Sequence, residues 1–574
     1  MVDKLMDNLI IMVGPKESLF NVAQRIASEK VTYYGIAAVI DEKKRVIGVI
    51  NDGDFLQLIT RQADLSQSVE TAMIKNPITV PSSLSHEEII ADVRKQLRER
   101  GATDKDWVRY VLIVDEDGVL VNVLRYVDLL SYYKGFGEKV AIYGQGFIGL
   151  TLSAALANRG HSVTGIDVSE KLIKALNQGQ IHIFEPRLGD TVMAALERES
   201  LQFDLPDGDF DANVYIIAVG SPVDSEGKVD LSAVETVCRQ IGARLKRGDL
   251  VMLRSTVPAG TTRNRVKPLL EKLTGLTAGH DFYLAFTPER TVEGQAMAEL
   301  VSLPQIVGGL THVCTQKAST FWGTLTDSVI HVQSLEAAEL VKLINNSFRD
   351  LSFSFSNAFA MLCDNYNLDA FQVISAANEG YPRNRIPSPS PGVGGYCLSK
   401  DPYLYASGEA ELDHARLAKI SRQINQVSAA YPVKVFDRYI KHIDKNAKQV
   451  SVLLVGLAFK GWPETNDLRG SSSLEVARLL KERGVRVLGW DAVVKTEEIE
   501  KAGLEPAEFP AACGQVDVIF ILNNHPRNTP EGLIGLCKGR KTLIFDGWAM
   551  LDHKNIEQVS GMTYATMGYC SPLK

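Results

Sequence analysis

Several features that mark whole classes of protein are missing from this 574-residue sequence. Its seven cysteines form no Cys-x-x-Cys pair, and neither they nor the ten histidines have the spacing of a metal site. We therefore expect no bound metal, and a reducing, cytoplasmic setting in which the thiols stay free. No apolar run approaches the ~18 residues that cross a membrane, and the first run, residues 9–13, is too short for a signal peptide.

An excess of positive charge is also absent. Lys and Arg number 62 against 69 Asp and Glu, the formal net charge is −7, and there is no basic cluster or arginine-rich stripe. This argues against a nucleic-acid partner. What is present is ordinary globular composition, 45% hydrophobic in a chain long enough for several domains of roughly 100 to 200 residues.

Residues 1–133 contain a weak internal repeat. Each copy, at 35–56 and at 110–130, has an apolar strand, an Asp-rich turn, a second strand and an aspartate that opens a helix. The linking segment 71–80 has a Met-x-x-x-Pro-x-Thr-Val pattern. Together these features resemble a tandem pair of CBS domains, an α+β module.

The CBS resemblance implies an adenine nucleotide between the repeats, with its ribose held by Asp54 and Asp128. The hydroxyl residue usual in the family is replaced by Asn51 in one copy and by Arg125 in the other. The alternative is that both aspartates only cap helices.

A strand and a glycine-rich turn begin at Lys139. The strand runs into Gly-x-Gly-x-x-Gly, followed by a predicted helix at 151–158 and a second strand at 161–167. Such glycines let a pyrophosphate approach the N-terminus of a helix. Asp167 ends the second strand with no Lys or Arg directly after it, which favours NAD over NADP. The predicted cofactor residues here are Gly144, Gly146, Phe147, Ile148, Gly149 and Asp167.

Polar loops follow three further apolar strands at 214–219, 249–254 and 281–286. The carboxyl ends of parallel strands line the ligand crevice of an open α/β sheet. We therefore expect these loops to meet the nicotinamide and the substrate. The residues concerned are Ser221, Pro222, Ser255, Thr256, Glu289 and Arg290.

A single cysteine, Cys397, lies in the glycine-rich segment 391–402, with Asp401 four residues later. Glycines allow positive φ and close approach of a substrate. A cysteine there can act as a nucleophile if neighbours lower its pKa. By itself the motif is more typical of a buried cysteine in an ordinary turn.

Six motifs occur in order: GQGFIGL, STVPAGTT, TPER, AAELVKLINNSFRD, PSPGVGGYCLSKDP and VGLAFKGWPETNDLRGSSS. From residue 139 onward the chain resembles the nucleotide-sugar 6-dehydrogenases, which oxidise the C6 alcohol of a UDP- or GDP-sugar with two NAD. The resemblance implies an α/β fold of two Rossmann-like parallel-sheet domains joined by a central α-helical domain, with a homodimer or higher homo-oligomer. With the CBS module, the expected domains are 1–133, 138–330, 331–446 and 447–574.

The resemblance also implies roles for particular residues. Cys397 would trap an aldehyde as a thiohemiacetal and then carry a thioester. Lys342 would stabilise oxyanion character, Asn346 would hold the C6 oxygen or a water, and Asp401 with Glu289 would activate water. The implied contacts with the nucleotide-sugar are Arg290, Gly394, Gly395 and Lys460, and Arg469 would reach NAD from the C-terminal domain.

The identity of the sugar stays open at this point. Residues 346–350 and 391–395 resemble the branch that oxidises UDP-N-acetylmannosamine or UDP-N-acetylglucosamine, whereas Tyr396 and Lys400 resemble the UDP-glucose branch. UDP-glucose and GDP-mannose are therefore alternative substrates. A second alternative is a catalytically inactive CBS nucleotide sensor, against which the retention of Cys397 argues.

Overall fold

A computed structural model describes residues 10–28, 36–51, 54–55, 58, 61, 63–84, 86–100, 110–125, 137–224, 227–326, 328–407 and 413–571. The chain divides into two compact units. The first is Met1–Gly137 with Asn158–Ser162, and the second is Glu138–Ala157 with Val163–Lys574.

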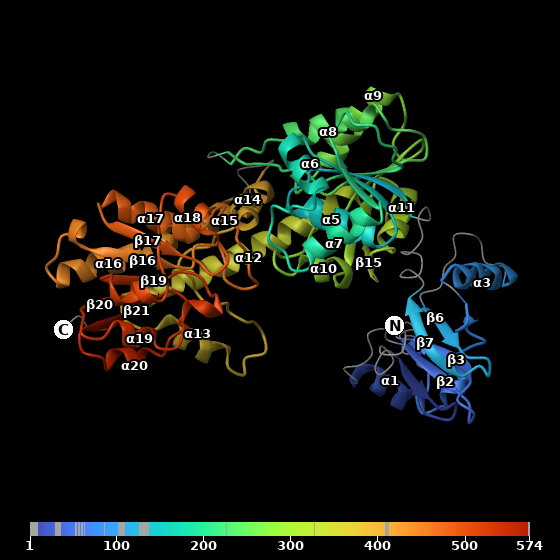
Figure 1. Ribbon diagram of the computed structural model, residues 1–574, viewed down its shortest axis with the longest axis horizontal. Coiled ribbons are helices and arrows are strands. Elements are labelled where there is room, and N and C mark those ends of the chain that lie inside the picture. The colour runs from blue at the N-terminus through green and yellow to red at the C-terminus, as the bar shows by residue number, and fades with distance from the viewer. Residues whose placement is uncertain are drawn as a thin grey trace. The chain divides into compact units, whose positions relative to one another are not determined.

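The first unit contains two small sheets that correspond to the predicted repeat (Figure 1). One sheet has β1 (Ile11–Val13), β2 (Ile36–Ile40), β3 (Val46–Asn51) and β4 (Ile74–Lys75), and the other has β5 (Thr79–Pro81), β6 (Tyr110–Val114) and β7 (Leu120–Arg125). Helices α1 (Leu19–Ser28) and α3 (His86–Glu99) complete the two copies. In each copy an Asp turn joins an antiparallel pair, β2 with β3 and β6 with β7. The predicted α+β class of this region is confirmed.

The second unit begins with an eight-stranded sheet in the order β10-β9-β8-β11-β12-β13-β14-β15. Its strands are β8 (Lys139–Tyr143), β9 (Ser162–Ile166), β10 (Leu201–Asp204), β11 (Val214–Ile217), β12 (Leu250–Leu253), β13 (Tyr283–Phe286), β14 (Gln305–Gly309) and β15 (Val329–His331). The pairs β9–β10, β8–β11, β11–β12, β12–β13 and β14–β15 are parallel, whereas β13 and β14 are antiparallel. The strands are apolar throughout because hydrophobic clusters cover both faces of the sheet.

Helices cover the two faces of this sheet. They are α5 (Phe147–Asn158), α6 (Glu170–Asn177), α7 (Leu188–Glu197), α8 (Ser232–Gly242), α9 (Lys267–Thr274), α10 (Ala296–Ser302) and α11 (His312–Trp322). The strand order reverses at β8, between β9 and β11. Such a switch point opens a crevice for ligands at the carboxyl ends of the strands.

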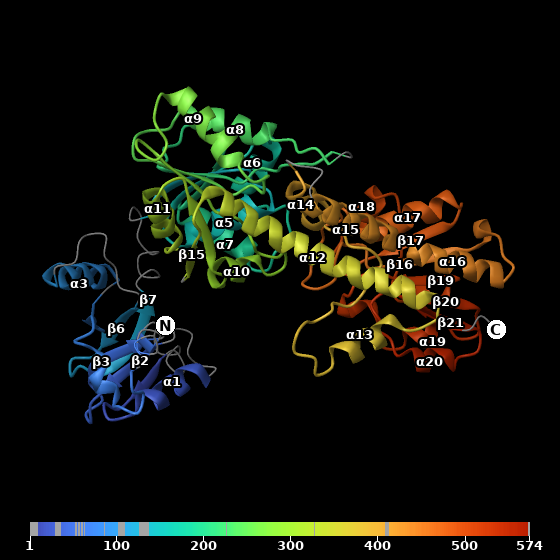
Figure 2. The same cartoon turned by 180° about the vertical axis from the view of Figure 1, so that it is seen from behind.

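A long helix, α12 (Leu335–Asp364), runs from this sheet into the C-terminal half (Figure 2). The Ser334 side chain caps it by accepting the backbone N–H of Ala337. The other central helices are α13 (Ala370–Asn378), α14 (Tyr396–Tyr405), α15 (Asp413–Ala429) and α16 (Tyr431–His442). The α-helical segment between the two sheets therefore matches the predicted fold class.

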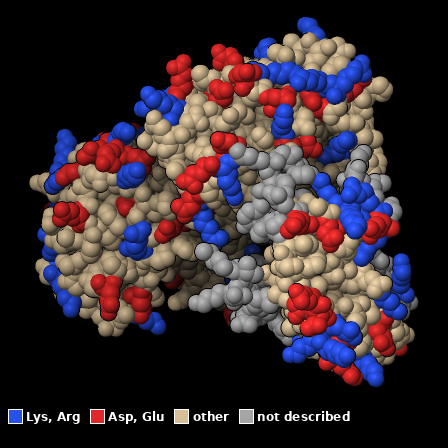
Figure 3. Space-filling view, turned by 45° about the vertical axis from the view of Figure 1, so that its right-hand side comes forward, with Lys and Arg blue, Asp and Glu red and all other residues tan. Residues whose placement is uncertain are grey.

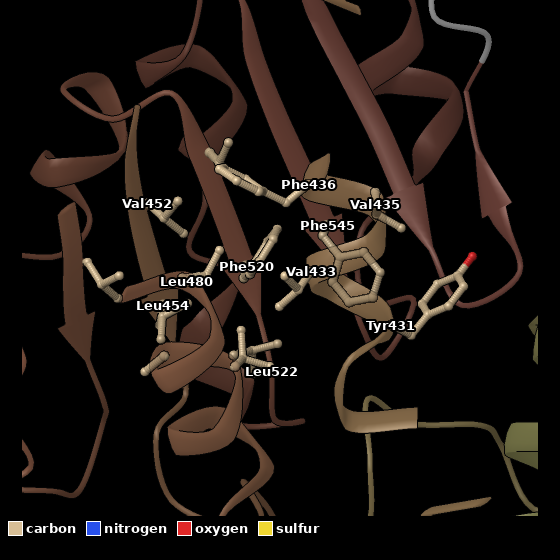
Figure 4. Packing of buried hydrophobic residues seen from close by; sticks show 14 of the residues in the cluster. Tyr431, Val433, Val435, Phe436, Val452, Leu454, Leu480, Phe520, Leu522 and Phe545 are labelled. Atoms are coloured by element: carbon tan, nitrogen blue, oxygen red, sulfur yellow. The ribbon is translucent and has the colours of Figure 1, made fainter. Parts of the chain in front are cut away.

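The C-terminal sheet has seven strands in the order β18-β17-β16-β19-β20-β21-β22. They are β16 (Ser451–Val455), β17 (Arg486–Trp490), β18 (Glu505–Pro506), β19 (Val518–Ile521), β20 (Thr542–Asp546), β21 (Met562–Thr566) and β22 (Tyr569–Cys570). Around it lie α17 (Ser472–Glu482), α18 (Thr496–Lys501), α19 (Leu533–Leu536) and α20 (His553–Glu557). Figure 4 shows the α16 side chains Val433 and Phe436 packed toward Phe520 and Phe545 of the sheet. Each such buried side chain contributes about 1.5–3 kcal/mol.

The surface and the helices give three further facts. On the face drawn in Figure 3, acidic and basic side chains are interspersed. Among the residues that the structure describes, no helix is both long and apolar enough to span a membrane. Within the same residues no group of three or more His, Cys, Asp and Glu side chains is arranged to hold a metal ion.

Candidate active site

The glycine-rich turn between β8 and α5 has the geometry of a dinucleotide cradle. Gly144 has a φ of +92°, and its N–H donates to Ile166 O at 2.7 Å. A Cβ on Gly149 would lie 1.7 Å from Gly144 O, so only glycine lets the helix approach the turn. A Cβ on Gly146 would meet no atom within 4 Å. Helix α5 begins at Phe147, directly after this open space. The free N–H groups of its first residues, Phe147 and Ile148, can therefore bind an anion.

Asp167 lies at the end of β9 beside this turn. Its carboxylate accepts the backbone N–H of Gln145 at 2.9 Å and of Ser169 at 3.0 Å. These bonds fix the carboxylate where the ribose of a dinucleotide would lie. His182 is close enough for the Asp167 charge to act on it; burial lowers the pKa of His182, and Asp167 opposes that shift.

A cavity of about 610 Å³ opens between the turn and the long loop of the C-terminal sheet. Its lining includes Gly146, Phe147, His182, Glu293, Thr465, Asp467 and Arg469. Arg469 is paired with Asp467 at 2.7 Å and lies 5.1 Å from the Tyr396 ring centroid. Arg469 and Gly146 therefore line the same cavity, and contact of Arg469 with NAD stays a prediction.

The loops after β11 and β12 are bonded to each other. Ser221 Oγ donates to Thr256 O, and Ser255 Oγ donates to Val219 O at 2.6 Å. Pro222 begins a hairpin that is closed by the N–H of Asp230 on Pro222 O, at 2.9 Å. The predicted nicotinamide-side residues thus lie together at the carboxyl edge of the sheet.

Cys397 lies in the first turn of helix α14. The sequence predicted it in the glycine-rich turn itself, but the helix begins at Tyr396, one residue before the cysteine. Gly395 precedes the helix with a φ of +89°. Cβ atoms on Gly394 and Gly395 would come within 2.5 Å of Gly470 O and 2.7 Å of the Phe459 ring. The loop therefore needs both glycines to pack against the C-terminal domain.

The Cys397 side chain is exposed, in contrast to five of the other cysteines, which are buried. Protein atoms around the thiol raise its pKa by desolvation, and the Lys342 ammonium is the strongest opposing influence. Asp401 raises the pKa further, while Lys400 lowers it. The helix N-terminus also favours a thiolate.

The buried face of α12 supplies two polar side chains to the site around this cysteine. Lys342 and Asn346, one turn apart, are both 7% exposed. Asn346 Nδ2 donates to Asp401 Oδ2 at 2.6 Å. Asp401 is buried, and its Oδ1 has no hydrogen-bond partner among the described residues, although Lys400 Nζ lies 3.6 Å away. An unpaired buried carboxylate oxygen is costly and indicates a place for water or substrate.

Glu289 lies in a buried ion pair that the sequence did not predict. Arg254 Nε donates to Glu289 Oε2 at 3.0 Å, and the N–H groups of Arg290 and Thr291 each donate to Oε1 at 2.7 Å. Burial works to raise the pKa of Glu289, but Arg254, the backbone bonds and Lys342 together lower it. The Glu289 carboxylate thus points toward Arg254, and the positive charge of Lys342 also stabilises its ionised form. The Arg290 guanidinium donates to the carbonyl of Pro304.

Glu293 is a second residue that sequence reasoning missed. Thr465 Oγ1 donates to its Oε2 at 2.9 Å, and Lys460 Nζ donates to its backbone O at 2.6 Å. Burial lowers the pKa of Lys460 and raises that of Glu293. The only sequence signal was a charged residue four positions after Glu289 in a polar loop.

In the first unit, Asp54 and Asn51 bond to each other at the start of a helix. Asn51 N donates to Asp54 Oδ2 at 2.9 Å, and Asp54 N donates to Asn51 Oδ1 at 3.1 Å. This is the arrangement of a helix cap. Asp128 lies outside the described residues.

The chain matches family models over most of its length. The NAD-binding, central and UDP-binding domains of the UDP-glucose/GDP-mannose dehydrogenase family match residues 138–326, 336–427 and 453–553. CBS domains match residues 2–61 and 68–135.

Two curated proteins and one solved structure illustrate the likeness. A UDP-N-acetyl-D-mannosamine dehydrogenase of Yersinia pestis is 36% identical over 68% of this chain and 94% of its own. An NDP-N-acetyl-D-galactosaminuronic acid dehydrogenase of Ralstonia nicotianae is 33% identical over 67% and 90%. The structure of UDP-D-ManNAc dehydrogenase from Pyrococcus horikoshii superimposes with a TM-score of 0.69 at 30% identity, covering 75% of this chain and 99% of that one.

Proposed function

The chain belongs to the UDP-glucose/GDP-mannose dehydrogenase family and is an NAD-dependent nucleotide-sugar dehydrogenase, and on that basis we propose that it oxidises the C6 hydroxyl of a UDP-N-acetylhexosamine to the carboxylate. Relatives named for N-acetylated sugars support this class of substrate. UDP-N-acetylmannosamine and UDP-N-acetylglucosamine are the two candidates. UDP-glucose, which Tyr396 and Lys400 favour, and GDP-mannose are the alternatives.

Cys397, Lys342, Asn346 and Asp401 carry this proposal because they meet at one place. When bound, NAD accepts a hydride from C6 in each of two oxidations. The Lys342 ammonium stabilises oxyanion character on the C6 oxygen. The Cys397 thiolate adds to the aldehyde carbon, and oxidation of that thiohemiacetal leaves a thioester.

Hydrolysis of the thioester requires a positioned water. Asn346 fixes one oxygen of Asp401, and the other, unpaired oxygen orients the water. The water oxygen bonds to the acyl carbon, the C–S bond breaks, and the departing sulfur takes up a proton. Glu289, paired with Arg254, acts on this site through its negative charge beside Lys342.

The nucleotide part of the substrate is proposed to lie against the C-terminal loop. Lys460 Nζ, held at the cleft by the Glu293 carbonyl, would bind the diphosphate. Arg290 and the backbone of Gly394 and Gly395 would contact the sugar. Arg469, in the cavity lining beside Gly146, would contact the NAD pyrophosphate.

The yield of NADH per UDP-sugar tests the proposal. Wild-type enzyme should form two NADH and one uronate, and Cys397→Ala should form no uronate. Cys570→Ala, a change at a half-buried cysteine outside the site, should leave the yield at two. A yield of one would indicate a simple alcohol dehydrogenase, and no turnover on a panel of UDP- and GDP-sugars would favour the inactive nucleotide sensor.

A homo-oligomer is also proposed, on the basis of an apolar stripe along α12. Its exposed members recur at helical spacing: Leu340, Ile344, Phe348, Phe355 and Leu362. On α15, Leu417, Ile420 and Val427 are also exposed. A patch of this kind usually marks an interface. Light scattering should give at least a dimer for wild type and a smaller species for Phe348→Glu; identical masses would contradict the proposal.

For the first unit we propose an adenine nucleotide that regulates the enzyme. The two CBS matches support this, whereas the bond between Asp54 and Asn51 favours the simpler capping role. A rise in melting temperature with AMP, ATP or an S-adenosyl compound would support nucleotide binding. No rise with any of them would leave Asp54 as a cap only.

A further inference from the structure

We propose that a buried polar network between α12 and α15 positions the Cys397 loop for catalysis. The network consists of Asp350 and Asn357 on α12 with Arg422 and Asn425 on α15. It rests on the proposed function only in taking Cys397 as the nucleophile. None of its members touches the reacting atoms, so they are positioning residues.

The placement of the network follows from the spacing of polar residues along α12. Lys342, Asn346 and Asp350 recur every four residues, and Asn357 follows two turns later. They therefore share one face of the helix. Lys342 and Asn346 belong to the reaction site. Asp350 and Asn357 lie farther along the same face of the helix.

Asp350 anchors the α15 half of the network. Its Oδ1 accepts Arg422 Nη1 at 2.5 Å and Asn425 Nδ2 at 2.8 Å, and its Oδ2 accepts Ser421 Oγ at 2.7 Å. Asp350 is fully buried and Arg422 is 4% exposed. Desolvation makes a buried ion pair of this kind a poor source of stability, so its presence suggests a role in geometry.

Two arms of the network reach the segment that leads to the cysteine. Arg422 Nη2 donates to Val393 O at 3.4 Å. On the other arm, Asn357 Nδ2 donates to Asn425 Oδ1 at 3.0 Å, while Asn357 Oδ1 accepts the N–H of Ser390 at 2.8 Å. Both ends of the short segment 390–393 are therefore held.

The held segment leads into a glycine-rich stretch, residues 392–395, that needs such support. Gly392 and Gly395 have φ values of +88° and +89°, and Gly394 lies between them, so few side chains restrict this stretch. Cys397 follows two residues later. A displacement of about 1 Å at a reacting atom can cost on the order of a hundredfold in rate. Anchoring Ser390 and Val393 thus sets where the sulfur meets C6.

Three variants test the network. Asn357→Ala removes the arm to Ser390, and Arg422→Lys keeps a charge beside Asp350 while lacking the planar fork that reaches Val393 O. Asp364→Asn is the control, because Asp364 ends the same helix and pairs with Arg438 and Tyr431 away from the loop. We expect kcat to fall at least tenfold in the first two variants, with the KM for NAD within twofold of wild type, and the control unchanged.

A second measurement does not depend on turnover. Alkylation of Cys397 by iodoacetamide, followed by mass spectrometry as a function of pH, should change in rate or midpoint in the two network variants and not in Asp364→Asn. Wild-type kcat and wild-type alkylation in folded network variants would overturn the proposal. If Cys397→Ala still formed uronate, the proposed function would fail, yet the alkylation profile would still decide whether the network positions the thiol.

Discussion

The NAD-binding sheet and the C-terminal sheet both contain a strand, a loop, a helix and a second strand followed by an aspartate. In the NAD-binding sheet the loop is residues 144–146, and in the C-terminal sheet it is residues 456–471. The aspartates are Asp167 and Asp491. The shared topology makes the differences between the two loops informative.

The carboxylate of Asp491 accepts four hydrogen bonds from backbone N–H groups of its own domain. Its Oδ2 accepts the N–H groups of Leu457 and Ala458 at 2.7 and 2.9 Å, and its Oδ1 accepts those of Val493 and Val494 at 2.9 and 3.1 Å. The N–H groups of Leu457 and Ala458, at the start of the long loop, are therefore already bonded and are not free to bind a ligand.

The first glycines of the two loops are alike, because a Cβ on Gly144 would lie 2.9 Å from Ala218 O and one on Gly456 would lie 2.4 Å from Asn523 Oδ1. The difference lies at Gly146, directly before α5, where a Cβ would meet nothing within 4 Å. The long loop of the C-terminal sheet carries Arg469 into the lining of the neighbouring cavity, and its Lys460 bonds to Glu293, which also lines that cavity. One topology serves two tasks because the loops differ.

The largest expected effect comes from filling the open cradle. Gly146→Ala should weaken NAD binding at least tenfold without lowering the melting temperature, because the new methyl group enters space that only the cofactor needs. Gly456→Ala should do the reverse, lowering the melting temperature by several degrees through the clash with Asn523. Isothermal titration with NAD and thermal melting measure both. Equal NAD affinity in Gly146→Ala would break the contrast between the sheets.

The two aspartates should differ in the same way. Asp167→Asn is expected to weaken NAD about tenfold and to reduce discrimination against NADP, because the negative charge that repels a 2′-phosphate is gone. Asp491→Asn loses a charged acceptor of four N–H groups and should cost about 2 kcal/mol of stability. Kinetics with both cofactors and denaturant unfolding measure these effects. A cofactor effect of Asp491→Asn in folded enzyme would contradict the assignment.

The sequence predicted those parts of the site whose residues lie close together along the chain. The cradle and Asp167 lie within 24 consecutive residues, so spacing alone was enough to place them. The Arg254–Glu289 pair and the Lys460–Glu293 bond join residues 35 and 167 positions apart. One sequence without its fold does not reveal which distant charges meet. The same limit hid the bond from Arg422 to Val393 O in the cysteine loop.

Asp54 illustrates a different limit. The sequence left two roles for it, ribose binding and helix capping, because both need a carboxylate at a helix start. The structure adds the bond from Asn51. Asn51 stands where the family has a hydroxyl residue, and its backbone N–H donates to the Asp54 carboxylate.

The last prediction concerns the loop after β12, which α12 holds in addition to the neighbouring strand. Glu339 accepts the N–H groups of Gly260 and Thr262 at 2.5 and 2.8 Å and the Thr262 hydroxyl at 2.6 Å. Burial nevertheless raises the pKa of Glu339 to about 7. Between pH 4.5 and 7 the folded chain keeps a proton that the unfolded chain has lost, so stability falls as pH rises. The loss totals at most about 3 kcal/mol.

Glu339→Gln should remove this slope. Melting temperatures at pH 5, 6 and 7.5 should fall less in the variant than in wild type. Glu336→Gln is the matched control one turn earlier, because Arg263 lowers the pKa of Glu336 to about 2 and its stabilisation is lost only below the range tested. Parallel pH slopes in wild type and Glu339→Gln would mean that the loop after β12, like that of the C-terminal sheet, is held by bonds that do not titrate near neutral pH.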